Sequence, residues 1–404
     1  MHVTGYTRAE LAQRAGVDPD SLDRFVELGV LAPGEGDRFR ASDVRRVNIV
    51  RALEDGGLPM PALGEALRRG DLSLDFVEQP SYDRFASLAT GTFRELSAET
   101  SIPIELLLVI REAMGFAHPE PDDRVRETEL EVVPFIEILL RAGIRHDLIT
   151  RSLRVYGDAA RRIAETEAAW WRTEILLPLF QAGKRGREIG ELTATFATEF
   201  AGINDVAILA LYHGQQSNAW MRNILEGFET VLSETGLHDR LDRDPAISFL
   251  DLTGYTRLTE ERGDDAAADL AGRLATLVQR SATQHTGKAV KWLGDGVMFH
   301  FRDAGEAVEA SLEMVDAAKL AGLPPAHVGV HAGPVLFQEG DYFGRTVNAA
   351  ARISDYARQG EVLVSQEVVD AADGNGAVAF TEIGPVELKG LAGALRLHVA
   401  RRRT

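Results

Sequence analysis

Residues 287–301 read GKAVKWLGDGVMFHF, and this stretch predicts two short strands joined by the turn Gly294-Asp295-Gly296. Polar and apolar residues alternate on both sides of the turn, which is the pattern of a β-hairpin. An Asp-Gly pair in a hairpin is by itself more often plain turn chemistry than a ligand, because such turns require positive φ. Asp295 is therefore either a turn residue or a ligand, and a second carboxylate decides between the two.

That second carboxylate is Asp251, which ends a short buried-strand pattern over residues 246–250. The stretch from Thr253 to Tyr255 follows, and then a helix predicted to run to about Gln284. An antiparallel arrangement of the two strand ends would bring Asp251 beside Asp295, and two such carboxylates repel unless divalent cations lie between them. The backbone N–H groups of Thr253, Gly254 and Tyr255 at a helix N-terminus could receive phosphate oxygens, although an acid before a helix is usually only a cap.

A third group of polar residues follows the strand predicted for residues 328–331. Asp341 opens the sequence DYFG, and a helix begins near Thr346. Asn348 and Arg352 are four residues apart on that helix, so they share one face. An amide and a guanidinium could together hold a sugar oxygen and a phosphate, although alone such a pair is more often a solvated face.

The composition of the 404-residue chain bounds the class of protein. Its length predicts two or three domains, and 45% hydrophobic with 26% charged residues exclude wholesale disorder. Because there is no cysteine, any metal must be held by oxygen or imidazole. A formal net charge of −18 disfavours non-specific contact with nucleic acid or anionic lipid. No apolar run approaches the ~18 residues of a membrane span and no secretion signal is visible, so we expect a cytoplasmic protein.

The first seventy residues show short helices separated by turns, in a helix-turn-helix order. Thr7 can cap a helix, Gly29 ends the next one, Arg38-Phe39-Arg40 looks like a small wing, and Ser42-Asp43 can cap a further helix. This head resembles the winged-helix domain of the mercury-resistance regulator (MerR) family. Where that family places basic contacts on its second helix, this chain has Asp20, Asp23 and Arg24, which predicts that DNA binding is unlikely. We expect a reused protein-contact or sensory module.

Residues 77–237 carry apolar positions at helical spacing and few strand signals, which predicts a helical regulatory region. The interval from Ile189 to Ser233 is long enough for two helices. Trp170 and Trp171 either fill the core or line a hydrophobic pocket for a small-molecule or lipid regulator.

Six motifs in a fixed order resemble one family, the class III adenylyl (nucleotide) cyclase catalytic domain, over about residues 244–400. The motifs are FLDLTGYT (249–256), KWLGDG (291–296), VGVHAG (328–333), DYFG (341–344), VNAAAR (347–352) and ELKG (387–390). The resemblance implies an α+β fold, a ferredoxin-like α/β sandwich with a βαββαβ core, preceded by an all-α regulatory region with a winged-helix-like head. We expect boundaries at 1–76 for the head, 77–237 for the regulatory region and 238–404 for the catalytic domain.

The resemblance also implies a role for each site residue. Asp251 and Asp295, with the Leu252 carbonyl as an extra ligand, would hold two Mg²⁺ or Mn²⁺ ions; one would activate the ribose 3′-hydroxyl and the other would neutralise the departing pyrophosphate. Lys291 and Asp341 would read adenine rather than guanine. Three further residues complete the set: Asn348 would orient the ribose, Arg352 would stabilise the transition state, and Lys389 would contact the triphosphate.

One residue departs from the family pattern. The family commonly has an arginine at the start of the strand leading to the Gly-x-His segment, where this chain has His327. A neutral imidazole would weaken pyrophosphate contact, and protonation at lower pH would restore the charge. Glutamine at position 327 would test this through the pH–rate profile.

In this family the metal-binding aspartates come from one subunit, and the base-reading, ribose and arginine positions from its partner. One chain here carries every position, so the resemblance implies a head-to-tail homodimer with two equivalent sites that makes cyclic AMP from ATP. The alternatives are a MerR-like regulator that uses a cyclase-like domain as a nucleotide sensor, and a guanylyl cyclase, which Lys291 and Asp341 disfavour.

Overall fold

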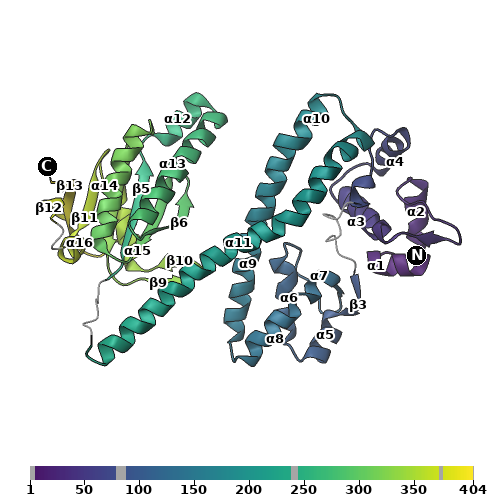
Figure 1. Ribbon diagram of the computed structural model, residues 1–404, viewed down its shortest axis with the longest axis horizontal. Helices are drawn as coiled ribbons and strands as arrows, with labels where there is room; N and C mark the ends of the chain where they lie inside the picture. Colours follow the sequence, from purple (N-terminus) through teal and green to yellow (C-terminus); the bar gives the residue numbers. More distant parts are fainter. Residues whose placement is uncertain (1–4, 79–87, 238–243, 373–375, 404) are drawn as a thin grey trace. The chain divides into compact units, whose positions relative to one another are not determined.

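The structure is a computed structural model that describes residues 5–78, 88–237, 244–372 and 376–403. The chain divides into two compact units, Met1–Glu226 and Gly227–Thr404. Figure 1 shows the first unit as mainly helical and the second as a sheet with helices packed on it.

The second unit is built on a seven-stranded sheet in the order β12-β13-β11-β8-β5-β7-β6. Its strands are β5 (Ala246–Leu252), β6 (Lys288–Leu293), β7 (Gly296–Phe301), β8 (Ala326–Ala332), β11 (Val362–Ser365), β12 (Val378–Glu387) and β13 (Ala394–Arg402). β5 pairs antiparallel with both β7 and β8. α13 (Asp264–Gln284) precedes β6, and α14 (Ala304–Leu320) joins β7 to β8. This succession is the predicted βαββαβ core, which is confirmed.

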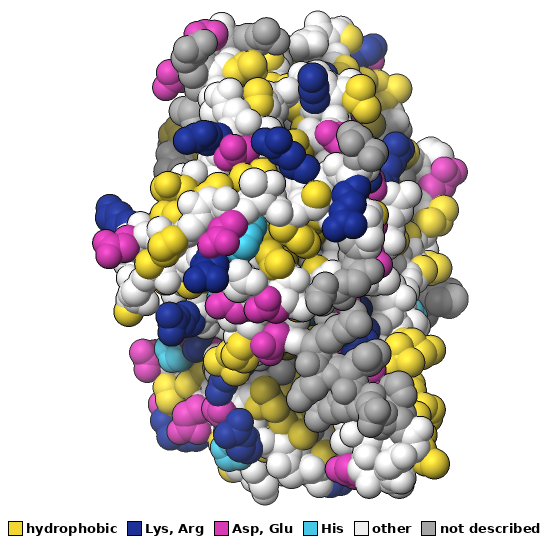
Figure 2. Space-filling model, turned by 90° about the vertical axis from the view of Figure 1, so that its left-hand side faces the viewer, with side chains coloured by type: hydrophobic (Ala, Val, Ile, Leu, Met, Phe, Trp, Pro, Cys, Tyr) yellow, Lys and Arg dark blue, Asp and Glu magenta, His cyan; other side chains and the backbone are white. Residues whose placement is uncertain are grey.

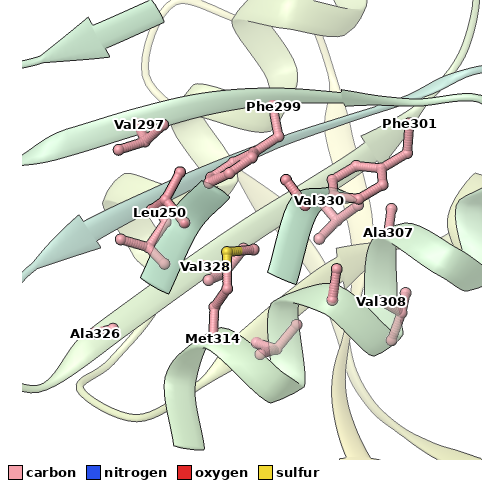
Figure 3. Close-up of a cluster of buried hydrophobic side chains, with 14 of the residues drawn as sticks. Leu250, Val297, Phe299, Phe301, Ala307, Val308, Met314, Ala326, Val328 and Val330 are labelled. Carbon is pink, nitrogen blue, oxygen red and sulfur yellow. The ribbon is translucent and has the colours of Figure 1, made fainter. Parts of the chain in front are cut away.

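Successive side chains along each strand point to opposite faces of the sheet, and both faces are buried. On one face Leu250, Phe299 and Val328 pack against Met314 of α14, as Figure 3 shows. On the other face Ile247 and other buried side chains pack under α15 (Arg345–Tyr356).

Gly329 of β8 explains why α15 lies so close to the sheet. A Cβ at this position would come within 2.1 Å of the backbone nitrogen of Ser354 in α15. The glycine in the VGVH motif therefore lets the helix that carries Asn348 and Arg352 pack directly on the strand.

The connection after β5 differs from the single predicted helix. α12 (Tyr255–Arg262) and α13 are separate helices, because Gly263 between them has a φ of 81°, which a continuous helix cannot accommodate. A two-stranded ribbon of β9 (Leu336–Gln338) and β10 (Asp341–Phe343) lies outside the main sheet, and α16 (Gln366–Ala371) follows β11.

His285, just after α13, links this helix to α14. Its Nδ1 lies 2.9 Å from a carboxylate oxygen of Glu306 and its Nε2 lies 3.1 Å from one of Glu313. Burial by itself lowers the pKa of His285, but the hydrogen bonds to Glu313 and Glu306 outweigh it, so the net pKa is raised.

This raised pKa predicts a pH-dependent stability. A group with a raised folded pKa contributes stability that is complete below its unfolded pKa of about 6.5 and lost as pH rises through the folded pKa. We expect the free energy of unfolding to fall more steeply in the wild type than in His285→Gln as the pH rises above about 6.5. Urea unfolding at a series of pH values measures this, with His213→Gln as the matched control on an exposed histidine. Equal slopes in wild type and His285→Gln would contradict the prediction.

The head of the first unit follows the predicted helix-turn-helix order. It contains β1 (Tyr6–Thr7), α1 (Arg8–Ala15), η1 (Pro19–Ser21), α2 (Leu22–Glu27), β2 (Arg38–Phe39), α3 (Ala41–Asp55) and α4 (Met60–Arg69). Thr7 caps α1 through a reciprocal hydrogen-bond pair with Glu10, as predicted. The predicted Ser42-Asp43 cap of α3 is wrong by two residues: Arg40 is the N-cap, and its N–H donates to Asp43 (2.8 Å).

Over its described residues, the rest of the first unit is helical with one short ribbon that the sequence did not predict, β3 (Leu88–Thr92) with β4 (Arg124–Arg126). The other elements are η2 (Asp75–Glu78), α5 (Phe93–Thr100), α6 (Ile104–Ala113), α7 (Glu127–Leu130), α8 (Val133–Arg141), α9 (His146–Trp170), the π-helix η4 (Trp171–Leu176), α10 (Leu177–Gln181) and α11 (Gly186–Glu234). The two helices predicted over Ile189–Ser233 are a single helix of 49 residues, the long α11 of Figure 1.

The long helix α11 exposes many apolar side chains. On length and composition alone it is the one helix among the described residues that could cross a membrane, with an 18-residue window of mean hydropathy 1.3. Only 6% of that window is buried. The prediction that the chain has no membrane span therefore stays a prediction.

Candidate active site

The two aspartates predicted to share a site lie together in the structure. Asp251 is in the last part of β5 and Asp295 is in the β6–β7 turn, beside Gly296 of the neighbouring strand β7. A Cβ on Gly296 would lie 3.3 Å from Oδ1 of Asp251, so the glycine leaves room for that carboxylate. Burial first, and then the negative charge of Asp295, raise the pKa of Asp251. The negative charge of Asp295 therefore disfavours ionisation of Asp251, which places the two carboxylates close enough to interact.

The donor set at this edge suits a hard divalent cation. Mg²⁺ and Mn²⁺ prefer carboxylate oxygens and commonly bind through one or two carboxylates together with substrate phosphates. Among the residues that the structure describes, no group of three or more His, Asp or Glu side chains could hold a metal ion. A cation held by Asp251 and Asp295 would take its remaining ligands from groups other than these side chains. Leu252, the last residue of β5, is buried, and its backbone forms a hydrogen bond that lowers the pKa of Asp251.

The segment after β5 is only partly arranged as predicted. The N–H of Thr253 donates to the carbonyl of Pro325 (2.9 Å), so this amide is engaged within the chain rather than offered to a phosphate. Gly254 has a φ of 79°, and Tyr255 begins α12. His327 lies directly opposite Asp251 in the β5–β8 register.

His327 is turned toward the aspartate edge. Its Nδ1 lies 3.1 Å from Oγ1 of Thr253, and its Nε2 lies 3.6 Å from Oδ2 of Asp251. The His327 side chain is 11% exposed. In this chain it thus contacts the groups around the aspartates, and its predicted contact with pyrophosphate stays a prediction.

Lys291 and Asp341 form an ion pair with 2.5 Å between Nζ and Oδ2. They come from different elements, β6 and β10, and both side chains are partly exposed. The pairing of β6 with β7 is irregular between Ala289 and Lys291, which is a β-bulge that redirects the lysine side chain. An ammonium and a carboxylate side by side present a donor and an acceptor to a ligand edge.

Asn348 and Arg352 share the exposed face of α15, as predicted. The guanidinium of Arg352 pairs with Asp355 one turn further on, with 2.7 Å between Nη1 and Oδ2. Asp355 also adds to the negative charge that raises the pKa of Asp251. Sequence reasoning missed Asp355, although its i,i+3 spacing from Arg352 was the available signal. Lys389 lies exposed in the connection between β12 and β13.

The predicted residues thus form two groups in one chain. Asp251 and Asp295 make one, and Lys291 with Asp341 lies in the other. Within the described part of the chain, no hydrogen bond or ion pair joins the two aspartates to Lys291, Asp341, Asn348 or Arg352. The fold and these groups define a class of protein: an α+β domain with two neighbouring carboxylates at one end of its central strands and a separate lysine–aspartate ion pair.

Comparison with known proteins agrees with this class. The family model of the adenylate and guanylate cyclase catalytic domain matches residues 241–400. The adenylate cyclase regulatory domain matches residues 44–212, and the MerR HTH family regulatory protein matches residues 6–70, so these two matches overlap.

Curated relatives extend over most of the chain. A pH-sensitive adenylate cyclase of Mycobacterium tuberculosis is 27% identical over 326 residues, covering 77% of this chain and 79% of the relative. An adenylate cyclase of Streptomyces coelicolor is 27% identical over 72% of this chain and 75% of its own length. An adenylate cyclase of Glutamicibacter nicotianae is 30% identical over 332 residues, covering 74% of this chain and 79% of the relative. The chain belongs to the adenylate cyclase family, with a class III catalytic domain behind a regulatory region and a MerR-type head.

The regulatory region contains a cavity of about 680 Å³. It lies among residues 71–76, the π-helix η4 and the start of α11, and its aromatic walls are Phe76, Trp171 and Phe180. Trp171 also packs against Phe196 of α11, with ring centroids 5.5 Å apart. Trp171 is thus a half-buried residue that lines the cavity and contacts an aromatic ring of α11, and a regulator bound in this cavity stays a prediction.

Proposed function

We propose that this chain converts ATP to 3′,5′-cyclic AMP and pyrophosphate. The observation that carries the proposal is the Lys291–Asp341 ion pair on a cyclase-type fold. The ammonium would donate to adenine N1 and the carboxylate would accept from the exocyclic amine, whereas guanine presents the opposite pattern at both positions. Polar groups left unpaired by the wrong base make this discrimination strong.

The remaining residues would orient the substrate and stabilise charge. Asn348 would hold the ribose, and Arg352 would face the charge that develops on the α-phosphorus during attack by the 3′-hydroxyl. Lys389 would contact the triphosphate. Asp251 and Asp295, with the Leu252 carbonyl as an extra ligand, would hold two Mg²⁺ or Mn²⁺ ions, which when bound would acidify the ribose hydroxyl and neutralise the leaving pyrophosphate.

A head-to-tail homodimer would bring the two groups together across its interface. Support comes from large apolar side chains that are exposed in the single chain near Lys291 and Asp341, the base-reading pair. These side chains are Trp292, Leu293, Leu336, Phe337 and Phe343. Exposed apolar patches of this kind mark interaction surfaces. The aspartates of one copy would then meet Lys291, Asp341, Asn348 and Arg352 of the other.

The N-terminal region would regulate this assembly in the cytoplasm, with the cavity beside Trp171 as the place for a small-molecule or lipid regulator. DNA binding by the head is disfavoured because two of its arginines, Arg8 and Arg24, are paired with carboxylates of the head itself. Arg8 pairs with Asp23 and Asp37 (2.7 and 2.8 Å), and Arg24 pairs with Glu54. Figure 2 views the molecule from the side on which Figure 1 draws the catalytic unit, not the head, and acidic and basic side chains are interspersed on that face.

The experiment is an assay of the purified chain with Mn²⁺ and either ATP or GTP, with the products separated by chromatography. We expect cyclic AMP and pyrophosphate from ATP and little cyclic product from GTP. A MerR-like nucleotide sensor would bind ATP without turnover, and a guanylyl cyclase would prefer GTP. Either result would overturn the proposal.

A further inference from the structure

Next to the base-reading pair, Lys291 with Asp341, four side chains from the same strands and their neighbours contact one another. Lys288 of β6 stands opposite His300 of β7, and Phe337 of β9 stands opposite Tyr342 of β10. The Tyr342 and His300 rings stack with centroids 4.2 Å apart and planes at 13°. Nζ of Lys288 lies 4.8 Å from the Tyr342 centroid and 5.0 Å from that of Phe337. These four residues are referred to below as the aromatic clamp.

The ribbon β9–β10 needs an anchor of this kind. It is a separate two-stranded sheet with only three residues in each strand, and such a ribbon is marginal on its own. Tyr342 is 9% exposed and packs in the buried cluster with Ile247 and Met298. Its ring therefore ties the ribbon to the core, and stacking together with the cation above the rings adds to that attachment.

The clamp is connected to Asp341 through the backbone. Oδ1 of Asp341 accepts from the N–H of Tyr342 (2.8 Å), while Oδ2 accepts from Nζ of Lys291 (2.5 Å). Strict alternation would send Lys288 and Lys291 to opposite faces of β6, because they are three residues apart. The bulge between Ala289 and Lys291 lets both lysines reach the same ribbon. A shift of Tyr342 would thus move the carboxylate away from Lys291.

We propose that the aromatic clamp sets the choice of nucleobase by holding Asp341 against Lys291; the proposal rests on the function proposed above. Selection by hydrogen bonds requires a donor and an acceptor at fixed positions, since the penalty for the wrong base comes from polar groups that cannot move to find other partners. A loosely held ribbon would let Asp341 turn away from guanine and escape that penalty. The four residues are positioning residues, and Lys291 with Asp341 makes the contact.

The test compares kcat/KM for ATP and for GTP in the full chain with Mn²⁺. Tyr342→Leu removes the stacked ring and is expected to lower the ATP-over-GTP ratio about tenfold. Lys288→Met removes the cation but keeps an apolar stem, and is expected to lower the ratio about threefold. Tyr342→Phe keeps the stack, Lys288→Arg keeps the cation, and Lys319→Met is the matched control on an exposed lysine of α14; all three should retain the wild-type ratio.

The ratio separates positioning from simple stability. If Tyr342→Leu and Lys288→Met lower kcat/KM for ATP and GTP by the same factor, the clamp only supports the fold and the proposal is wrong. Lys288→Met keeps the test decisive if Tyr342→Leu fails to fold, which thermal unfolding would reveal. If the wild type makes no cyclic nucleotide, the proposed function fails. The clamp is then tested by the relative affinities of fluorescent ATP and GTP analogues for wild type and Lys288→Met, and an unchanged ratio overturns it.

Discussion

Replacing Arg352 with alanine is expected to lower kcat for cyclic AMP formation by about 10³-fold, or about 4 kcal/mol of transition-state stabilisation. The guanidinium lies exposed on α15 and would meet negative charge that develops on phosphorus only during the reaction. KM for ATP should change little, because the interaction is made mainly in the transition state. Initial rates at a range of ATP concentrations separate kcat from KM.

The matched control for this change is Arg280→Ala, which removes an exposed arginine from α13. It should leave both constants near the wild-type values. Near-full turnover in Arg352→Ala would show that another residue stabilises the transition state. A large rise in KM with unchanged kcat would instead assign Arg352 to ground-state binding of the triphosphate.

Mixing two inactive variants is expected to restore activity. Asp251→Asn removes a carboxylate from the aspartate pair, and Arg352→Ala removes the transition-state group, so each homodimer should be nearly silent. In a mixed dimer one of the two sites would contain only wild-type groups if the aspartates and Arg352 come from different copies. Random exchange of an equal mixture should therefore recover about one quarter of the wild-type activity.

The control for this experiment is a mixture of Asp251→Asn with Asp295→Asn. Both changes affect the same group of residues, so every site in a mixed dimer carries at least one defect and activity should stay at background. Recovery in the control would point to refolding or contamination. No recovery with Asp251→Asn and Arg352→Ala, in protein shown to be dimeric, would place all site residues within one copy.

Part of the regulatory region could not be predicted from local sequence. Two helices were expected over Ile189–Ser233, a stretch that contains Gly202 and Gly214. The structure has one helix through both glycines, where a side chain would meet open space. A glycine in a helix costs only about 1 kcal/mol relative to alanine, which is too little to end a helix without a stop signal or a competing contact. The ribbon β3–β4 depends on residues more than thirty positions apart, so local periodicity carried little signal for it.

The sequence alone determined the catalytic fold. Alternating polar and apolar residues mark the strands, and the Gly-Asp-Gly turn marks the hairpin. The order of the six motifs matches one family. The sequence also placed Asp251 beside Asp295 by an antiparallel pairing of the two strand ends, and Asn348 on one face with Arg352 by helical spacing, which is a short-range rule. Only the tertiary structure decided where Lys291 points. That direction depends on a bulge and on the ribbon carrying Tyr342, which lies some fifty residues further along the chain. Contacts between such distant segments arise from packing in three dimensions, which periodicity along the chain does not encode.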